Sequence, residues 1–231
     1  VAQLPASAAP NGLALERDKL YIADSELGVV WQVPAAGGAA QVWADDPLLK
    51  QVSGDLLPGP NGLKVFQGEV YVSNSETGKI LAIKLNRDGS SYAELFDFSN
   101  SPQGEAPTAL LEGTDGKLYG TTSSGGTNAY GVVFQVNKNG SGYAAFWHLS
   151  PSGPYSPVAL VQGGNGALYS ATKSGGFALR GTMFTVSTNG SNYSLLWTFS
   201  NTGGGEGYVS TPPVIQASDG KLYGVTQNGG S

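Results

Sequence analysis

A Leu-Tyr or Val-Tyr pair recurs five times along the chain, and this repeat constrains the fold more than any other feature. The tyrosines are Tyr21, Tyr71, Tyr119, Tyr169 and Tyr223, at intervals of 50, 48, 50 and 54 residues. Short strand-like runs separated by glycine turns surround each pair. A period of about 50 residues built in this way is typical of the blades of a β-propeller and not of helical hairpins.

The third repeat shows how one blade is encoded. Four runs are expected to form antiparallel strands: residues 107–111, 117–122, 132–136 and 143–149. The dipeptides Asp115-Gly116 and Asn139-Gly140 favour the positive φ angles of tight hairpin turns. In the fourth run, alternation predicts one shared face for Tyr143, Ala145, Trp147 and Leu149. The sequence therefore predicts an all-β propeller with four-stranded antiparallel blades and almost no helix.

The first two repeats differ from the third and fourth in their motifs. Pro-Asn-Gly-Leu opens the first strand at 10–13 and at 60–63, and the second strand ends in Asp24-Ser25 or Asn74-Ser75. The pattern changes near residues 85–89, inside the second blade. Either a natural gene has diverged unevenly, or two propellers have been recombined.

We expect one propeller domain over residues 1–231, with four complete blades and an incomplete fifth. The repeats run over residues 9–58, 59–105, 106–155, 156–209, and 210–231 together with 1–8. Residues 210–226 supply two strands of the fifth blade, and residues 1–6 are expected to close it as an outer strand, which would remove free sheet edges. The fifth repeat still lacks about one strand. The chain could be cut from a longer one, the last blade could be three-stranded, or a neighbouring molecule could donate a strand, a form of self-association.

Composition excludes several classes of function. Charged residues make up 13% of the chain and the net charge is −5, so no basic surface for nucleic acid is expected. No run approaches the roughly 20 apolar residues of a membrane helix. The chain has no cysteine, which excludes disulfides and thiolate metal sites.

Four polar side chains are expected at the mouth of the central channel. Asn11 and Asn61 begin first strands, while Asp24 and Asn74 end the antiparallel second strands, so all four should reach the same end of the propeller. One carboxylate and three amides are ligands suited to Ca²⁺ or Mg²⁺. The sequence predicts weak binding of such an ion by Asn11, Asn61 and Asp24, or no cofactor at all.

These four residues also have a purely structural interpretation. Asparagine before glycine favours a turn at the strand entry, and Asp24 and Asn74 could cap the loops that follow them. The single histidine, His148, falls on an outer strand, away from the channel, which argues against a Ser-His-Asp triad.

The tryptophans could suggest carbohydrate stacking, but their spacing favours another role. Trp147 and Trp197 occupy equivalent positions, and Phe96 stands at the matching position of the second blade. Equivalence across blades is what packing of each blade on the next requires, so we expect these rings in the core between blades.

Two family resemblances cover nearly the whole chain. Residues 9–86 resemble the senescence-marker-protein/gluconolactonase family of six-bladed propellers, through Pro-Asn-Gly-Leu, Tyr-Ile-Ala-Asp-Ser at 21–25 and Gly-Val-Val-Trp-Gln-Val-Pro at 28–34. Residues 86–231 resemble the GloVer tandem repeats of large bacterial surface proteins, through Asp-Gly-Lys-Leu-Tyr-Gly at 115–120 and 219–224 and Gly-Thr-Met-Phe-Thr-Val at 181–186.

The first resemblance implies a metal-dependent lactonase whose metal is held by carboxylates and asparagines from first strands. The family's asparagine maps onto Asn61 and, by repetition, onto Asn11. Its partner carboxylates do not map, because Thr108, Val158 and Pro212 occupy those positions. The second resemblance implies an extracellular or cell-surface setting without known catalysis.

The expected function is therefore a non-catalytic scaffold or binding module, extracellular or of recombined origin. The alternative is a lactonase-type hydrolase with a degenerate metal site at the channel mouth. A third possibility is lectin-like binding of a glycan or another small molecule in the grooves between blades.

Overall fold

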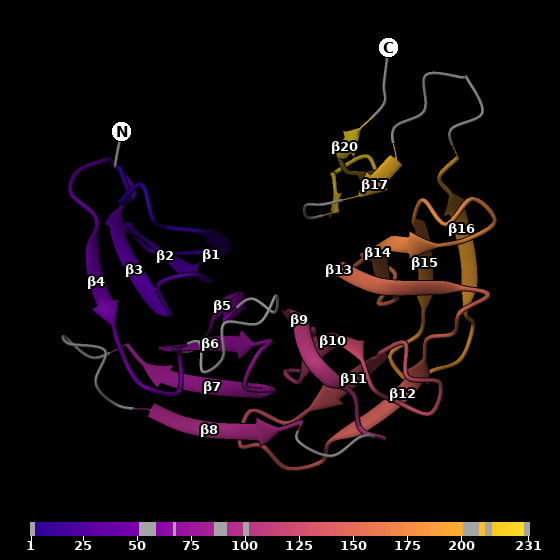
Figure 1. Cartoon of the computed structure of the whole chain (residues 1–231), viewed down its shortest axis with the longest axis horizontal. Coiled ribbons are helices and arrows are strands. Elements are labelled where there is room, and N and C mark those ends of the chain that lie inside the picture. The colour runs from indigo at the N-terminus through magenta and orange to yellow at the C-terminus, as the bar shows by residue number, and fades with distance from the viewer. Residues whose placement is uncertain are drawn as a thin grey trace.

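The computed structural model describes residues 3–50, 59–66, 68–85, 92–98, 102–200, 208–210 and 214–228. In these residues the chain forms β-strands and turns but no helix, and so no helix that could cross a membrane. Four four-stranded antiparallel sheets stand side by side along an arc (Figure 1). This arrangement is that of consecutive propeller blades, which confirms the predicted fold class.

Each complete blade is a simple meander of four strands in chain order. Blade one comprises β1 (Pro10–Glu16), β2 (Lys19–Asp24), β3 (Val29–Pro34) and β4 (Gln41–Ala44). Blade two comprises β5 (Pro60–Phe66), β6 (Glu69–Asn74), β7 (Lys79–Lys84) and β8 (Tyr92–Asp97). Blade three comprises β9 (Glu105–Glu112), β10 (Leu118–Ser124), β11 (Val132–Val136) and β12 (Ala144–His148). Blade four comprises β13 (Pro154–Gln162), β14 (Leu168–Gly175), β15 (Thr182–Val186) and β16 (Ser194–Thr198).

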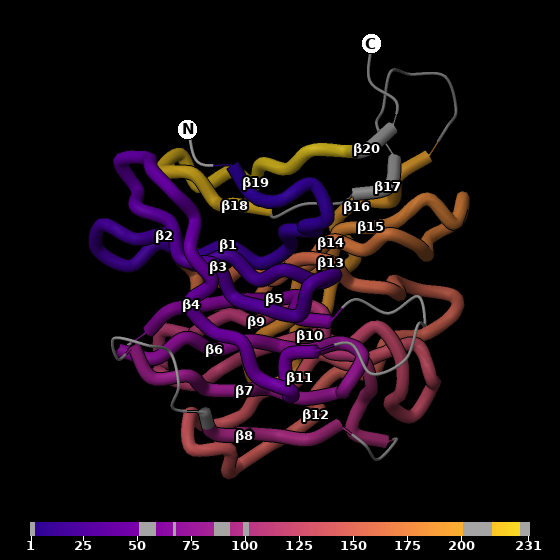
Figure 2. Tube along the Cα trace, turned by 60° about the vertical axis from the view of Figure 1, so that its left-hand side comes forward, coloured from indigo at the N-terminus to yellow at the C-terminus, as the bar shows by residue number. Residues whose placement is uncertain are grey.

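The first strand of each blade lines the inner side of the arc and the fourth strand lies outside (Figure 1). Along the inner side β1 contacts β5, β5 contacts β9, and β9 contacts β13. The same succession of β1, β5 and β9 is visible from a second direction (Figure 2). The ends of neighbouring first strands are therefore close enough for side chains of two blades to meet.

The fifth blade begins as predicted but is not closed by the N-terminal segment. β17 (Tyr208–Ser210) pairs with β20 (Thr226–Asn228), and β18 (Ile215–Gln216) pairs with β19 (Leu222–Tyr223) across the expected turn. The described residues 3–9 form no strand and pair with none of these four strands. They turn back instead, because the backbone N–H of Ala8 donates to the carbonyl of Pro5 (3.0 Å). Blade one, which follows this segment, and β20 lie on opposite sides of the opening of the arc (Figure 1).

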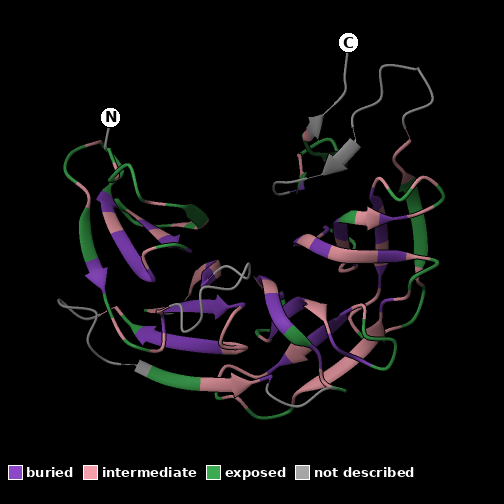
Figure 3. Ribbon diagram, viewed as in Figure 1, coloured by how far each residue is buried: buried purple, intermediate pink, exposed green. Residues whose placement is uncertain are grey.

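Most of the hydrophobic core lies between blades. Tyr71 of blade two packs in one cluster with Leu118 and Phe134 of blade three, and Tyr119 packs with Leu168 and Phe184 of blade four. Burial is strongest in the second and third strands of the blades, whereas β1 and β16, at the two ends of the row of complete blades, carry many exposed residues (Figure 3). At Tyr71 and Tyr119 the repeated tyrosine thus joins one blade to the next.

The outer strands do not alternate as simply as expected. In blade three Val133 pairs with Trp147 but the adjacent Phe134 pairs with Ala145, so Phe146 forms a β-bulge. As a result, Ala145 packs toward the cluster shared with blade two, and Trp147 toward the cluster shared with blade four. The prediction of a single face for residues 143–149 was wrong, because the extra residue reverses the alternation.

The equivalent aromatic residues stack between blades. Phe96 lies parallel to Tyr143 of the next blade, with ring centroids 4.1 Å apart and an interplanar angle of 9°. Trp147 lies parallel to Tyr193, with centroids 4.3 Å apart at 10°. For Phe96 and Trp147 the expected packing between blades is confirmed.

We predict that alkaline pH destabilises the fold partly through Tyr119. Burial and a hydrogen bond from its hydroxyl to Asp115 Oδ2 (2.8 Å) raise the pKa of Tyr119 to about 12. Because the folded state favours the neutral phenol, this contribution is complete below pH 10 and is lost as pH rises from 10 to 12. Urea unfolding at pH 9 and pH 11 should show a smaller loss of unfolding free energy for Tyr119→Phe than for the wild type. An equal loss in both proteins would contradict the assignment.

Candidate functional site

The four polar residues predicted at the channel mouth lie at the same end of two adjacent blades. Asn11 follows the first residue of β1 and Asn61 follows the first residue of β5. In the strand register Pro10 is opposite Asp24, and Pro60 is opposite Asn74. The antiparallel pairing therefore brings Asn11 beside Asp24 and Asn61 beside Asn74, as the sequence indicated.

The two asparagines at the strand entries take part in a hydrogen-bonded link between blades. Asn11 Nδ2 donates to Ser25 Oγ (3.2 Å), and Ser25 Oγ donates to the carbonyl of Pro60 in blade two (2.7 Å). Asn61 Nδ2 likewise donates to Ser75 Oγ (3.0 Å). Ser75 Oγ in turn donates to the carbonyl of Pro107 in blade three. The Pro-Asn-Gly motif and the serine after the second strand thus form one linked unit, repeated twice.

Asp24 is fully buried, and both of its carboxylate oxygens accept hydrogen bonds. Oδ1 accepts from the backbone N–H groups of Ala9 (3.0 Å), Glu26 (3.2 Å) and Leu27 (3.0 Å). Oδ2 accepts from the indole N–H of Trp31 (2.8 Å). The carboxylate therefore holds the turn between β2 and β3 in place, and a metal ion would have to displace these donors.

Asn74 occupies the same position in blade two with a different set of partners. Its Oδ1 accepts from the N–H groups of Glu76 and Thr77, both at 3.1 Å. Its Nδ2 donates to the carbonyls of Leu48 (3.0 Å) and Leu49 (3.2 Å). An amide is required here because the carbonyls of Leu48 and Leu49 are acceptors and need an N–H donor. At Asp24 all the partners are donors, so a carboxylate is suitable there.

Two threonines that sequence reasoning did not single out complete this series. Thr122 Oγ1 accepts from the N–H of Val132 (3.0 Å) and donates to the carbonyl of Ser124 (3.0 Å). Thr172 accepts from Thr182 N–H (3.0 Å) and donates to the carbonyl of Ser174 (2.8 Å). Each lies three residues after the repeated tyrosine, as do Asp24 and Asn74, and that spacing was the available signal. A buried polar cap of the loop between the second and third strands is therefore common to all four complete blades.

The third and fourth blades supply no carboxylate at the positions that match Asn61. Thr108 Oγ1 lies 3.0 Å from Thr121 Oγ1, and Val158 is apolar. Pro212 lies outside the described residues. No group of three or more His, Asp or Glu side chains that could hold a metal occurs in the described part of the chain. Asn11, Asn61 and Asp24 together therefore do not fit a divalent metal of the lactonase type.

His148 lies on the outer strand β12, as expected. Its Nδ1 accepts the backbone N–H of Thr127 (3.1 Å) in the loop before β11. Its hydrogen bond serves to hold this loop to the edge of the blade.

A polar hollow lies between blades two and three, the kind of place that the lectin-like possibility requires, but its residues were not predicted. Its volume is about 260 Å³, and its lining residues come from the turn after β6, the residue after β8 and the blade-three strands β9 and β10: Ser75, Glu76, Thr77, Gly78, Phe98, Glu105, Ala106 and Ser124. Its hydroxyl and carboxylate groups can form hydrogen bonds with a small polyhydroxylated molecule. No sequence motif marks it, because the residues come from separate segments of two blades.

Exchanging the two caps should destabilise the protein in both directions. Asp24→Asn replaces an oxygen that accepts hydrogen bonds with an amide group facing donors, and we expect a loss of about 2 kcal/mol of unfolding free energy. Asn74→Asp places a carboxylate against the carbonyls of Leu48 and Leu49, and we expect a loss of about 3 kcal/mol. Urea denaturation measures both. Asn165→Asp, in an exposed turn, is the control and should change stability by less than about 0.5 kcal/mol. Neutral effects of both cap exchanges would show that these contacts do not stabilise the fold.

Solved structures of propellers with different activities have the same fold. A chain in a nidogen–laminin complex has a TM-score of 0.70 at 14% identity, covering 95% of this chain and 73% of its own. Virginiamycin B lyase from Staphylococcus aureus has a TM-score of 0.65 at 13% identity, covering 96% and 71%. A putative gluconolactonase has a TM-score of 0.64 at 12% identity, covering 95% and 72%. At these identities the similarity shows the fold alone.

Comparison with curated proteins found no match. The sequence profile of the Gloeobacter/Verrucomicrobia repeat, in contrast, matches residues 60–231. The match begins at β5, so it includes the second blade as well as the residues from 86 onward that carried the expected resemblance. Because it extends over well more than half of the sequence, the chain belongs to the Gloeobacter/Verrucomicrobia repeat family.

Proposed function

We propose that this chain is a non-catalytic β-propeller module that acts as an extracellular scaffold or binding module. The observation that carries the proposal is the hydrogen bonding of Asp24. This residue is the one carboxylate of the predicted channel-mouth set, and it accepts four hydrogen bonds from its own blade and from the segment leading into it. A group that is needed to hold a turn is poorly suited to bind a metal or to act as a base.

The extracellular setting is supported by the family of the chain, whose repeats resemble those of bacterial surface proteins. A recombined origin is supported by the change of cap from Asp or Asn in blades one and two to Thr in blades three and four. The segment at residues 86–91, where the motifs change, lies outside the described residues.

If the module binds a small molecule, the hollow between blades two and three is the proposed binding site. Small polyols or sugars could form hydrogen bonds there with the exposed Glu105 and with the half-buried Ser124. Binding should appear as a ligand-dependent rise in the melting temperature, reduced by Glu105→Gln. A sugar panel without any such rise would restrict the proposal to a scaffold.

The alternative is a lactonase-type hydrolase with Asn11, Asn61 and Asp24 around a weakly held Ca²⁺ or Mg²⁺, and it differs in a simple observable. We expect native mass spectrometry after equilibration with about 1 mM CaCl₂ or MgCl₂ to show no stoichiometrically bound ion. We also expect EDTA to leave the melting temperature unchanged and lactones to be hydrolysed no faster than in buffer. A bound ion lost in Asn61→Ala but kept in Asn165→Ala, together with turnover abolished by EDTA, would overturn the proposal in favour of the hydrolase.

A further inference from the structure

The outer strand of a blade offers a repeated surface to the blade that follows it. The surface consists of a bulged residue and the large aromatic residue next to it. These pairs are Leu95-Phe96 in β8, Phe146-Trp147 in β12 and Leu196-Trp197 in β16. Their registers are equivalent, because Phe96, Trp147 and Trp197 pair with Ile80, Val133 and Met183 respectively.

The first two of these surfaces are covered by the same hairpin motif of the next blade. Asn-Gly-Ser-x-Tyr occurs at 139–143 and again at 189–193. Its tyrosine stacks on the aromatic residue, Tyr143 on Phe96 and Tyr193 on Trp147.

The glycine of the motif brings its backbone against the bulge. Gly140 and Gly190 both have a φ of 81°. A Cβ at Gly140 would overlap the carbonyl oxygen of Leu95, and one at Gly190 would overlap that of Phe146. Glycine is therefore required at this position of the motif both by the turn and by the close approach.

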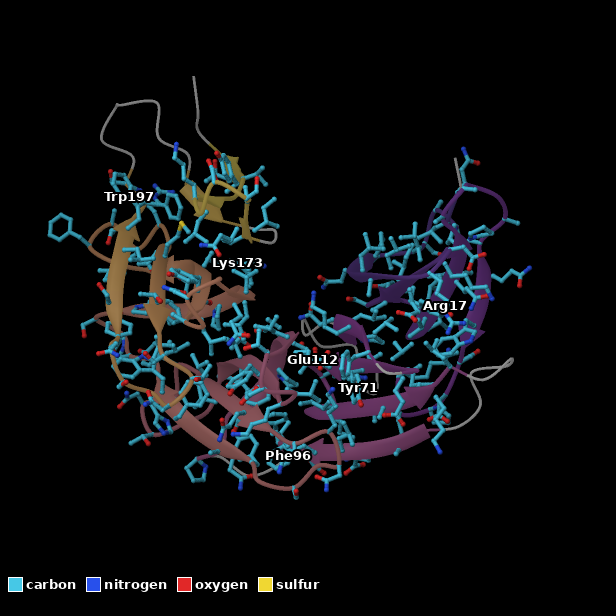
Figure 4. The ribbon with its side chains drawn as sticks, turned by 180° about the vertical axis from the view of Figure 1, so that it is seen from behind. Arg17, Tyr71, Phe96, Glu112, Lys173 and Trp197 are labelled. Atoms are coloured by element: carbon cyan, nitrogen blue, oxygen red, sulfur yellow. The ribbon has the colours of Figure 1, made fainter. Side chains whose placement is uncertain are left out.

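The third surface, on β16, is exposed. Trp197 is 48% exposed, and Leu195 and Leu196 are 45% and 43% exposed. A shallow hollow of about 240 Å³ is lined by residues 195–198. Figure 4 shows Trp197 on the outer strand at the far end of the four complete blades, whereas Phe96 lies in the middle of the arc. The described part of blade five packs elsewhere, since Val214 contacts Ala159 and Ala171.

We propose that this surface on β16, residues 195–198, is a docking site for a β-hairpin of the Asn-Gly-Ser-x-Tyr type from another repeat of the same family. The occupant is defined by continuity with the two interfaces inside the chain: a tyrosine to stack on Trp197, and a glycine turn to approach the backbone of Leu196. The two hairpins of this motif within the described residues are each already seated on their own preceding blade. A second copy of the folded chain therefore does not offer either of them.

A peptide with the sequence of residues 181–196 provides a probe that contains the motif and no tryptophan. It is labelled with fluorescein and titrated with the full chain, and anisotropy reports binding. We expect saturable binding that is weakened at least tenfold by Trp197→Ala in the protein or by Tyr193→Ala in the peptide. Leu15→Ala, which alters a residue 59% exposed at the other end of the arc, should change the affinity less than twofold.

An isolated hairpin is only marginally stable, so a second measurement joins the same segment to the chain. Residues 181–196 are appended after Ser231 through a flexible Gly-Ser linker, which raises the effective concentration of the hairpin. Iodide quenching should then show reduced access to Trp197, compared with the same fusion carrying Tyr→Ala in the appended copy. Binding unaffected by Trp197→Ala would overturn the proposal. Absence of binding in trans together with unchanged quenching in the fusion would overturn it as well.

Discussion

The structure depends on the packing of each blade against the next. A four-stranded meander cannot bury both of its faces alone, and the clusters around Tyr71 and Tyr119 each combine residues from two blades. Tyr71, Tyr119 and the stacked pairs Phe96–Tyr143 and Trp147–Tyr193 thus contribute to holding the arc together. At Trp197, which occupies the position of Phe96 and Trp147, the described residues provide no such neighbour and the side chain is 48% exposed.

The polar residues at the channel mouth form a second set of contacts between and within blades. Asn11 and Asn61 connect neighbouring blades through serine hydroxyls, while Asp24, Asn74, Thr122 and Thr172 cap equivalent loops. The nature of the cap follows the loop. The short turns after β2 and β6 have Asp or Asn, and the longer glycine-rich loops after β10 and β14 have Thr. These hydrogen bonds favour a structural role for residues that, in sequence, resemble ligands.

Periodicity and turn chemistry were sufficient to predict the fold, because the strand-like runs of each repeat are separated by glycine turns and recur at about 50 residues. They were also sufficient to place Asn11, Asn61, Asp24 and Asn74 at one end. The capping of the following loop by Asp24 was among the interpretations of the sequence and is confirmed at Glu26 and Leu27, but the bonds from Ala9 and Trp31 could not be predicted, since these residues come from other segments. The bulge at Phe146 could not be predicted, because a one-residue insertion leaves no distinct pattern in the sequence. Closure of the fifth blade by a strand at residues 1–6 was expected, but the described part of this segment turns between Pro5 and Ala8 instead.

A double-mutant cycle on Trp147 and Tyr193 tests the dependence on packing between blades most directly. Unfolding free energies would be measured in urea for Trp147→Ala, Tyr193→Ala and the double variant. If the two rings stabilise the interface through their stacking, the losses should be non-additive, with a coupling energy of about 1 kcal/mol. Additive losses, within about 0.3 kcal/mol, would show that the two residues act independently and would contradict the account.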